Sequence, residues 1–369
     1  GVRVMYFDRV QDITLNARNG FAVGDDLPGT TAFSSTMQYE AAKRITINDL
    51  NVVGSAAGGG GKDGHYIGLG PGNTPCEDIH INGGSAKYCK RLGGAVTGGL
   101  RTRINGVELA YNTGAPGAGF DVEANVYGVV DDTVFTNCHV HHNENAGIVQ
   151  SFGTNTQVIG GSSHDNGAFG VGGGSGGIQF QDGVYRPYID IVGIAGTNNA
   201  TGVITIGGSV ANLPVGMVVM FNMLSGATKP AEFVGSYKIV SRHVGSNGIV
   251  LGDAVDYKEV TSFAAGFTGV LDGDPAIATA RLYVFADGQS DGLRVENVKI
   301  YNNGQDGIVF GGSGNGTATG CEVYDNNGSQ IVSAYARGAV ITNNDVYQTP
   351  AVSANRTGIA ATVGSGTLD

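Results

Sequence analysis

A short motif recurs along most of this 369-residue chain: a glycine followed by a few residues in which apolar side chains alternate with other side chains. Copies within the first half follow one another at about 20 to 28 residues, the spacing typical of solenoid repeats. A repeat of this length cannot bury its own apolar face, so neighbouring copies must stack. The clearest copies begin at Gly64, Gly93, Gly119, Gly147, Gly170, Gly292, Gly307 and Gly358.

Strands of a second kind lie between these copies, and turns rich in Asn, Asp and Gly close the coils. The second strands are expected at 78–82, 103–107, 133–137, 156–160, 293–300 and 339–343. The turns lie at 142–143, 165–167, 302–304 and 325–328. Asn and Gly tolerate left-handed backbone conformations, and Asn side chains can bond turn amides, so such turns suit a stack of coils.

The pattern predicts an all-β fold, a single-stranded right-handed parallel β-helix. In each strand the Ile, Val and Phe side chains should point into the coil, while the residues between them face outward. The Asn-Gly turns recur too often to leave room for helices of ordinary length. Only residues 38–43 resemble a short helix.

The repeat is interrupted between about Thr197 and Tyr283. Four short apolar runs there, at 203–206, 218–221, 237–240 and 248–251, are typical of hairpin strands. We therefore predict a first solenoid part at 1–196, a small β-rich insertion at 197–284 and a second solenoid part at 285–369. The chain starts in a strand-like run, and because solenoid ends need covering, further residues are expected before Gly1.

Composition excludes several classes of protein. The 64 glycines lack the period of three that collagen requires. A net charge of −11 argues against a nucleic-acid partner, and no apolar run is long enough for membrane insertion. Cys138 and Cys321 occupy matching places in their coils and are expected to be buried thiols, whereas Cys76 and Cys89 are either a disulfide or two free thiols.

Asp121 and Glu123 are the strongest catalytic candidates. They lie two residues apart in one strand, so both should face outward with alpha carbons about 7 Å apart. Glycosidases use carboxyl pairs at comparable separations, one as the general acid and the other as base or nucleophile. The alternative is an exposed acidic strand without a catalytic role.

The segments 63–68, 91–94 and 112–125 together resemble bacterial and phage right-handed β-helix proteins of the pectate-lyase-like superfamily. Those proteins carry a strand of the form Gly-Ile-Asp-Ile-Glu-Pro-Asn, and the resemblance covers residues 62–152. The resemblance implies a polysaccharide site centred on Asp121 and Glu123. Ala124 replaces the proline of the pattern, and the Asp-Pro-His triplet of mannuronan epimerases is absent.

Residues on neighbouring coils should line the same groove, because the rungs of a solenoid lie about 4.8 Å apart. Arg91 should either hold a sugar carboxylate or pair with Asp63 or Glu123. His65, close to Asp63, is the best candidate for a catalytic histidine. The predicted substrate-binding residues are Asp63, His65, Tyr66, Arg91, Asn125, Ser151, Gln179 and Gln181, with Thr97 and Asp182 as further candidates.

Two other groups of charged or titratable residues receive structural interpretations. His139 and His141 should share a face next to His142, but no third ligand follows at a metal spacing, so we predict a solvated turn and no metal site. Arg294 and Glu296 should form an exposed ion pair.

The first functional hypothesis is a tailspike-type depolymerase that cuts a bacterial surface glycan. The second is a secreted polysaccharide lyase or uronan epimerase, and the third is a glycan-binding solenoid without catalysis. No cofactor is expected, except calcium if the protein is a lyase. By analogy with tailspikes we expect a homotrimer, located outside the cell or on a virion tail.

Overall fold

The computed structural model of the protein describes residues 5–23, 35–54, 63–124, 129–167, 176–180, 188–194, 203–206, 218–223, 236–243, 248–253, 280–285, 292–311, 315–334, 338–349 and 357–362. It divides into two compact units. One consists of Gly1–Val184 together with Gln289–Asp369, and the other of Tyr185–Gly288.

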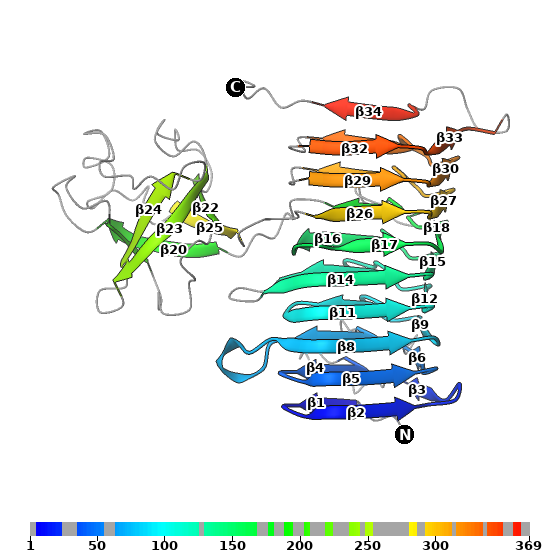
Figure 1. The fold of residues 1–369 in the computed structure, drawn as a ribbon, viewed down its shortest axis with the longest axis horizontal. Coiled ribbons are helices and arrows are strands. Elements are labelled where there is room, and N and C mark those ends of the chain that lie inside the picture. Colours follow the sequence, from blue (N-terminus) through cyan, green and yellow to red (C-terminus); the bar gives the residue numbers. More distant parts are fainter. Residues whose placement is uncertain are drawn as a thin grey trace. The chain divides into compact units, whose positions relative to one another are not determined.

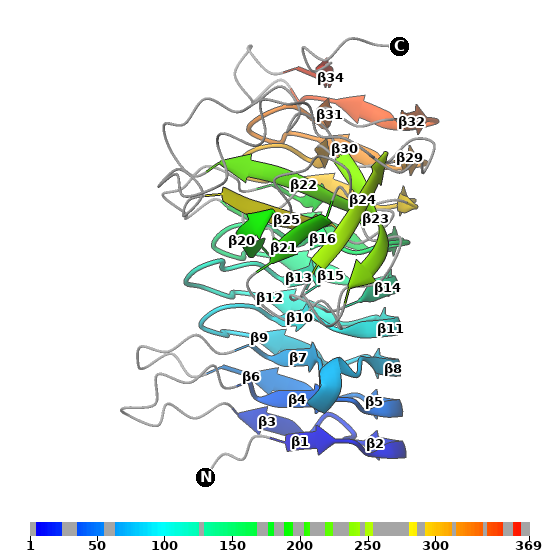
Figure 2. The same ribbon diagram turned by 90° about the vertical axis from the view of Figure 1, so that its left-hand side faces the viewer.

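The first unit is a stack of coils whose strands form three parallel sheets (Figures 1 and 2). Sheet A contains β1 (Met5–Asp8), β4 (Met37–Glu40), β7 (His65–Gly68), β10 (Gly94–Val96), β13 (Phe120–Glu123), β16 (Ile148–Phe152), β19 (Ile178–Phe180), β28 (Ile308–Gly311), β31 (Ile331–Ala334) and β34 (Ile359–Thr362). Sheet B contains β2 (Gln11–Asn16), β5 (Lys43–Asn48), β8 (Cys76–Asn82), β11 (Gly99–Asn105), β14 (Val130–Thr136), β17 (Gln157–Ile159), β26 (Leu293–Glu296), β29 (Asn315–Thr319) and β32 (Gly338–Thr342).

Sheet C contains β3 (Phe21–Val23), β6 (Asn51–Val53), β9 (Ser85–Lys87), β12 (Glu108–Ala110), β15 (His139–His141), β18 (Ser162–His164), β27 (Lys299–Tyr301), β30 (Glu322–Tyr324) and β33 (Asp345–Tyr347). A single 3-10 turn, η1 (Pro71–Asn73), is the one helical element among the described residues. The parallel β-helix is thus confirmed. The sequence analysis missed sheet C, because its three-residue strands are too short to show a period.

The recurring glycine is explained by close packing between consecutive coils. A side chain on Gly119 would place its Cβ 2.6 Å from the carbonyl oxygen of Gly147 and 3.0 Å from Nδ2 of Asn143. Gly147 and Gly307 are crowded in the same way by the carbonyl oxygen of the following coil and by an Asn amide. A Cβ does not fit at these three glycines, which explains why glycine opens most, though not all, strands of sheet A.

A ladder of buried amides runs along the inside of the stack. Each Asn side chain donates to the amide oxygen of the next member, in the order Asn112, Asn143, Asn166, Asn303, Asn326 and Gln330, with N···O distances of 2.7–3.0 Å. The five Asn residues stand on consecutive coils, and Gln330, four residues after Asn326, ends the ladder. The same oxygens accept backbone N–H groups, as at Asn143 and Asn166. The predicted bonding of turn amides by Asn is confirmed.

The stack continues across the insertion in the sequence. β17 pairs with β26, β18 pairs with β27 and β19 pairs with β28. Asn166 and Asn303, 137 residues apart, are neighbours in the amide ladder. The coil therefore resumes in register.

Three details of the sequence interpretation are corrected or lie outside the described residues. Residues 38–43 are not helical: they fall in β4 and β5, where Met37 and Tyr39 alternate into the core. The strand after Gly292 belongs to sheet B and not to the sheet of the other glycine copies. The copy at Gly170 lies outside the described residues. All four cysteines are free and buried.

The second unit is a small closed barrel of antiparallel strands. Its strands are β20 (Tyr188–Ile194), β21 (Val203–Ile206), β22 (Val218–Met223), β23 (Ser236–His243), β24 (Gly248–Asp253) and β25 (Ala280–Phe285), in the order β20-β21-β24-β23-β22-β25. The unit extends beyond the predicted limits of 197–284 at both ends, so β20 belongs to it. Within the described part of the chain, no helix has the length and apolar character to cross a membrane.

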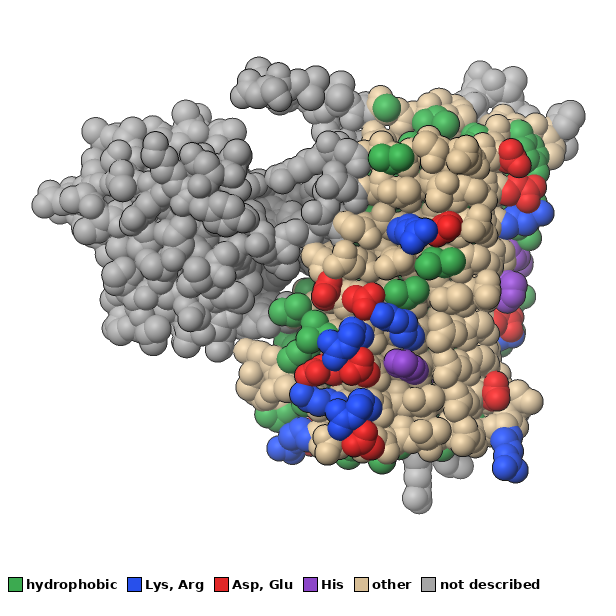
Figure 3. Space-filling model, viewed as in Figure 1, with side chains coloured by type: hydrophobic (Ala, Val, Ile, Leu, Met, Phe, Trp, Pro, Cys, Tyr) green, Lys and Arg blue, Asp and Glu red, His purple; other side chains and the backbone are tan. Residues whose placement is uncertain are grey.

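Charged side chains gather on the outer face of sheet B, over its first coils (Figure 3). They form cross-strand ion pairs such as Lys43–Glu77 at 2.6 Å and Arg101–Asp78 at 2.7 Å. Arg294 and Glu296, two residues apart within β26 on a later coil, also form an ion pair, as predicted. Hydrogen bonds from Lys43 and Arg101 lower the pKa values of Glu77 and Asp78, so these carboxyl groups are not suited to hold a proton.

Candidate active site

The acid strand β13 lies in the middle of sheet A. Phe120 and Val122 point into the core, so Asp121 and Glu123 lie on the outer side of the sheet. The backbone register aligns the Asp121 position with outward residues of four neighbouring coils, which are Tyr66, Ala95, Val149 and Gln179. The predicted outward direction of both carboxylates agrees with this register.

The expectation that the pair projects into solvent is wrong for Asp121, which is only 6% exposed. The reason is a second apolar cluster, separate from the core, formed by Leu92, Ala95, Ala118 and Ala146. Tyr66 and Val149 pack against it, and both belong to the outward row that contains Asp121. Around β13 the outer side of sheet A therefore also carries apolar groups.

Burial has a direct electrostatic consequence for Asp121. Its pKa is raised well above the ordinary value, first by desolvation, then by the charges of Glu123 and Asp63, while Arg91 opposes the shift. Oδ1 of Asp121 has no hydrogen-bond partner among the described residues. Glu123 is only partly buried, and desolvation also raises its pKa, against the effect of Arg91. Asp121 is thus the carboxyl group that holds a proton most readily.

Arg91 links the pair to a third carboxyl group. Its guanidinium NH1 lies 3.0 Å from Oδ2 of Asp63, which is 3% exposed. Burial raises the pKa of Asp63 to about 6, although Arg91 and the backbone N–H of Leu92 act in the opposite direction. Oδ1 of Asp63 also lacks a partner in the described part of the structure. The ion pair with Asp63, one of the two predicted alternatives for Arg91, is present.

The prediction that His65 belongs to the substrate groove is wrong. Its register neighbour is the core residue Met37, it is 2% exposed, and its Nδ1 lies 3.2 Å from the hydroxyl of Tyr39. Burial lowers the pKa of His65 to about 4. The alternation within β7 turns His65 and Ile67 into the coil and Tyr66 outward, whereas Asp63 precedes the strand, so His65 cannot touch a substrate on the outer face.

The other predicted binding residues are distributed around the acid pair. The Tyr66 hydroxyl accepts a hydrogen bond from Thr97 at 2.9 Å, and Gln179 is buried in the same outward row as Asp121. Ser151 is the extra residue of a bulge opposite Val122 and Glu123 and is half-buried. Asn125, Gln181 and Asp182 lie outside the described residues.

The sequence interpretation missed the apolar residues that bury the site. A signal was present: Leu92, Ala118 and Ala146 each directly precede the glycine that opens a strand of sheet A. They stand one coil apart at the place that Asp63 occupies in its own coil. Because these three apolar residues recur at the same place in consecutive coils, they could have predicted an apolar environment that excludes water beside Asp121.

The structure also places the histidines that the sequence grouped. His139 is exposed on β15, with Nδ1 3.2 Å from the hydroxyl of Ser162. His141, at the end of the same strand, is half-buried, and its Nε2 lies 3.1 Å from Glu108. His142 begins the following turn. The shared outward direction of His139 and His141 is confirmed by the buried Val140 between them.

One comparison with a known protein family agrees with this architecture. Residues 283–368 match a family model described as a right handed beta helix region. The solved mannuronan C-5 epimerase A-module of Azotobacter vinelandii aligns with a TM-score of 0.46 and 12% identity, over 90% of this chain and 62% of that one. The chain thus spans less than two thirds of that structure's length. No curated protein matches the sequence. The family match and the three stacked parallel sheets together identify the chain as a right-handed parallel β-helix protein.

Proposed function

We propose that the protein is a polysaccharide depolymerase of the tailspike type, which hydrolyses glycosidic bonds of a bacterial surface glycan on the outer side of sheet A. The observation that carries the proposal is the state of Asp121: it is buried, its Oδ1 has no partner among the residues that the structure describes, and its pKa is raised. A carboxyl group with a raised pKa holds its proton to a higher pH than an ordinary Asp and can donate it to a leaving oxygen.

Asp121 and Glu123 divide the work between them. Because both carboxyls repel each other's charge, the pair holds one proton over a range of pH. Asp121, the more buried of the two, holds that proton and acts as the general acid. Glu123, which is partly exposed, is the ionised partner that activates water or attacks the anomeric carbon.

Neighbouring residues serve to position the sugar chain. Tyr66 and Gln179 stand two rungs to either side of Asp121, at about 10 Å each. An extended glycan lying along this row would contact an aromatic ring and an amide on opposite sides of the acid. Arg91 offsets part of the negative charge of the three carboxyls and lowers the pKa of Glu123 against the larger effect of burial, which favours its ionised form.

Arg91 also supports the second candidate, a polysaccharide lyase or uronan epimerase. Its guanidinium already binds the carboxylate of Asp63, so the same fork is chemically suited to a uronate carboxylate. In that reaction a base removes the C5 proton, and an arginine neutralises the developing charge. The absence of both reactions would leave the third candidate, a glycan-binding solenoid.

The proposal is tested by incubating the protein with purified capsular polysaccharides, lipopolysaccharides and uronate polymers. A hydrolase shortens the polymer and creates reducing ends alone, whereas a lyase also creates an unsaturated sugar that absorbs in the ultraviolet. Asp121→Asn and Glu123→Gln should each lower the rate by a factor of about 10³. The exposed Asp345 of sheet C supplies the control Asp345→Asn, which should cleave at the wild-type rate.

Two outcomes would contradict the proposal. Cleavage that persists in both variants would remove the acid pair from the reaction. A polymer that binds but keeps its length would make the protein a binding solenoid. The proposal also includes a homotrimer outside the cell or on a virion tail, and light scattering of the purified chain measures the assembly.

A further inference from the structure

A compact group of imidazoles and carboxylates lies on the opposite part of the coil, where sheet C ends. β15 ends at His141 and β18 ends at His164, and the register pairs these two residues. The next residues, His142 and Asp165, both have a left-handed backbone with φ of 53°. The stack therefore places a two-by-two array of side chains on two consecutive coils.

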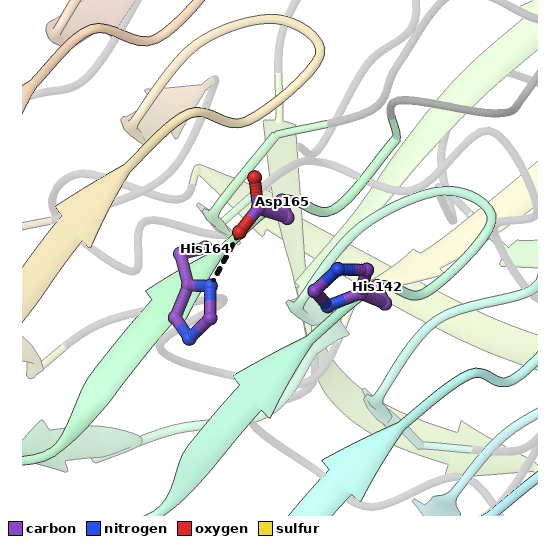
Figure 4. Close-up of side chains that lie close together, drawn as sticks. All are labelled: His142, His164 and Asp165. Carbon is purple, nitrogen blue, oxygen red and sulfur yellow. Dashed lines mark hydrogen bonds and ion pairs between the residues drawn. The ribbon is translucent and has the colours of Figure 1, made fainter.

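Three of these side chains converge on one point (Figure 4). One ligand atom from each of His142, His164 and Asp165 lies within 4.8 Å of the other two. Nδ1 of His164 lies 2.7 Å from Oδ2 of Asp165. All three side chains are partly exposed, so an ion and its bound water could reach the point from solvent.

The surroundings hold the rings in place. His164 is stacked between the ring of His141, at 5.1 Å and 8°, and the ring of Tyr301, at 4.6 Å and 7°. Nδ1 of His142 contacts Nδ1 of His141 at 2.9 Å, and His141 in turn contacts Glu108 at 3.1 Å. A carboxylate that orients a histidine, which orients a second group, is the usual outer shell of a metal site.

The donor set selects the kind of ion. Two imidazole nitrogens and one carboxylate oxygen suit Zn²⁺ and similar first-row ions, with bonds of about 2.1 Å. Ca²⁺ requires six to eight oxygen ligands, and the cluster supplies a single carboxylate at the point of convergence. Water would complete the coordination, since the three side chains come from one side of the coil surface.

We propose that His142, His164 and Asp165 form a binding site for a divalent first-row transition-metal ion, with Zn²⁺ as the representative, and that the ion joins two consecutive coils. The site lies where strands β15 and β18 of sheet C end, and it has no part in the reaction proposed for Asp121 and Glu123. A histidine motif within one strand could not reveal it, because His142 and His164 stand on different coils and meet only in the folded chain.

The test is calorimetric titration of the full chain, without an affinity tag and after dialysis against a chelator, with ZnCl₂ at neutral pH. One ion should bind per chain. His164→Gln and Asp165→Asn should each weaken binding at least tenfold. His139→Gln is the matched control, because His139 is exposed on the same strand as His141 but contacts Ser162, and it should bind like the wild type.

A second measurement guards against a variant that fails to fold. Bound Co²⁺ should give visible absorption bands with the wild type and with His139→Gln, and weaker bands with Asp165→Asn. Addition of CaCl₂ should not displace the bound Co²⁺. Circular dichroism verifies that each variant keeps its β-helix. The proposal is overturned if no saturable Zn²⁺ binding occurs, if folded His164→Gln binds as tightly as the wild type, or if His139→Gln loses binding equally.

Discussion

The amide ladder lies inside the coil, and the acid cluster of Asp63, Asp121, Glu123 and Arg91 lies on the outer side of sheet A. Both contain buried polar groups, but these groups are fully hydrogen-bonded in the ladder and incompletely hydrogen-bonded in the acid cluster. In the ladder, Asn143 and Asn166 each donate to the next side chain and accept from the previous coil. In the acid cluster, Asp63 and Asp121 each have an oxygen with no partner among the described residues.

This difference in hydrogen bonding distinguishes residues with a structural role, in the ladder, from residues suited to a reaction, in the acid cluster. A fully bonded network is stable in a medium of low polarity and fixes the register of the coils. A buried carboxyl without partners costs free energy, which the fold must offset elsewhere. Such a cost is expected at functional sites, where a shifted pKa is useful. The comparison therefore predicts opposite effects of substitution in the two rows.

Asn166→Ala tests the ladder and should have the largest effect. The substitution removes the Oδ1 that accepts both the backbone N–H and the side-chain amide of Asn143, and the Nδ2 that donates to Oδ1 of Asn303, all deep in the coil. At about 1–3 kcal/mol for each buried group left unbonded, the free energy of unfolding should fall by roughly 3–5 kcal/mol. Urea denaturation followed by circular dichroism measures it.

Asn105→Ala is the matched control for that loss. Asn105 belongs to an outer amide row on sheet B, where its Nδ2 donates to Asn82 at 2.7 Å, and it is only partly buried. Water can replace that bond, so the cost should stay below about 1 kcal/mol. Equal losses for Asn166 and Asn105 would show that the inner ladder has no special role.

His65 tests an intermediate case, a group inside the coil with one bonded nitrogen and one unpaired nitrogen. Because burial lowers its pKa to about 4, the folded protein resists protonation that the unfolded chain accepts near pH 6.5. Its contribution to stability is complete above pH 6.5 and is lost as the pH falls toward 4. The loss should reach about 3 kcal/mol.

The measurement compares the wild type with His65→Gln at pH 7 and at pH 4. The variant has no group that titrates at this position, so its stability should fall less between the two values. Parallel falls in the two proteins would mean that His65 is not kept neutral by the fold.

Asp121→Asn should change stability in the opposite direction to Asn166→Ala. The raised pKa of Asp121 means that its contribution to stability is greatest below about pH 4, and declines as the pH rises toward the folded-state value. A neutral amide avoids that decline and removes the repulsion from Glu123. Above neutral pH the variant should be more stable by on the order of 1–3 kcal/mol, while it loses the proposed activity.

Thermal unfolding at pH 5 and pH 8 provides the check for Asp121→Asn. The gain over the wild type should be larger at pH 8. A variant that is less stable at both values would place Asp121 with the structural amides, and would remove the reason for regarding the acid cluster as a site.

Periodic features of this fold could be predicted from the sequence, and features that depend on contacts between coils could not. The columns of glycine and of turn Asn residues repeat along the chain, so both the stack and the ladder follow from them. The outward direction of Asp121 follows from its position between the inward-facing Phe120 and Val122. Its burial depends on Leu92, Ala118 and Ala146, which come from three different coils.

The interpretation of His65 was wrong, and the proximity of His142 to His164 and Asp165 was not foreseen, for the same physical reason. Proximity in sequence suggested that His65 accompanies Asp63, but strand alternation turns His65 toward Tyr39 in the core. His142 lacked a further ligand in its own strand, and the ligands lie one coil away. Pairwise geometry across coils requires the exact coil lengths, and these vary along the chain.

Arg294→Ala should have the smallest effect and defines the lower end of the comparison. Arg294 is exposed on sheet B and pairs with Glu296, which water can solvate equally well after the substitution. An exposed pair of this type contributes about 0–0.5 kcal/mol, and salt should remove most of that contribution. Denaturation of the wild type and the variant at low and high salt measures the difference. A loss above about 1 kcal/mol would show that the polar groups on the surface also stabilise the stack, and that burial alone does not distinguish the ladder from the acid cluster.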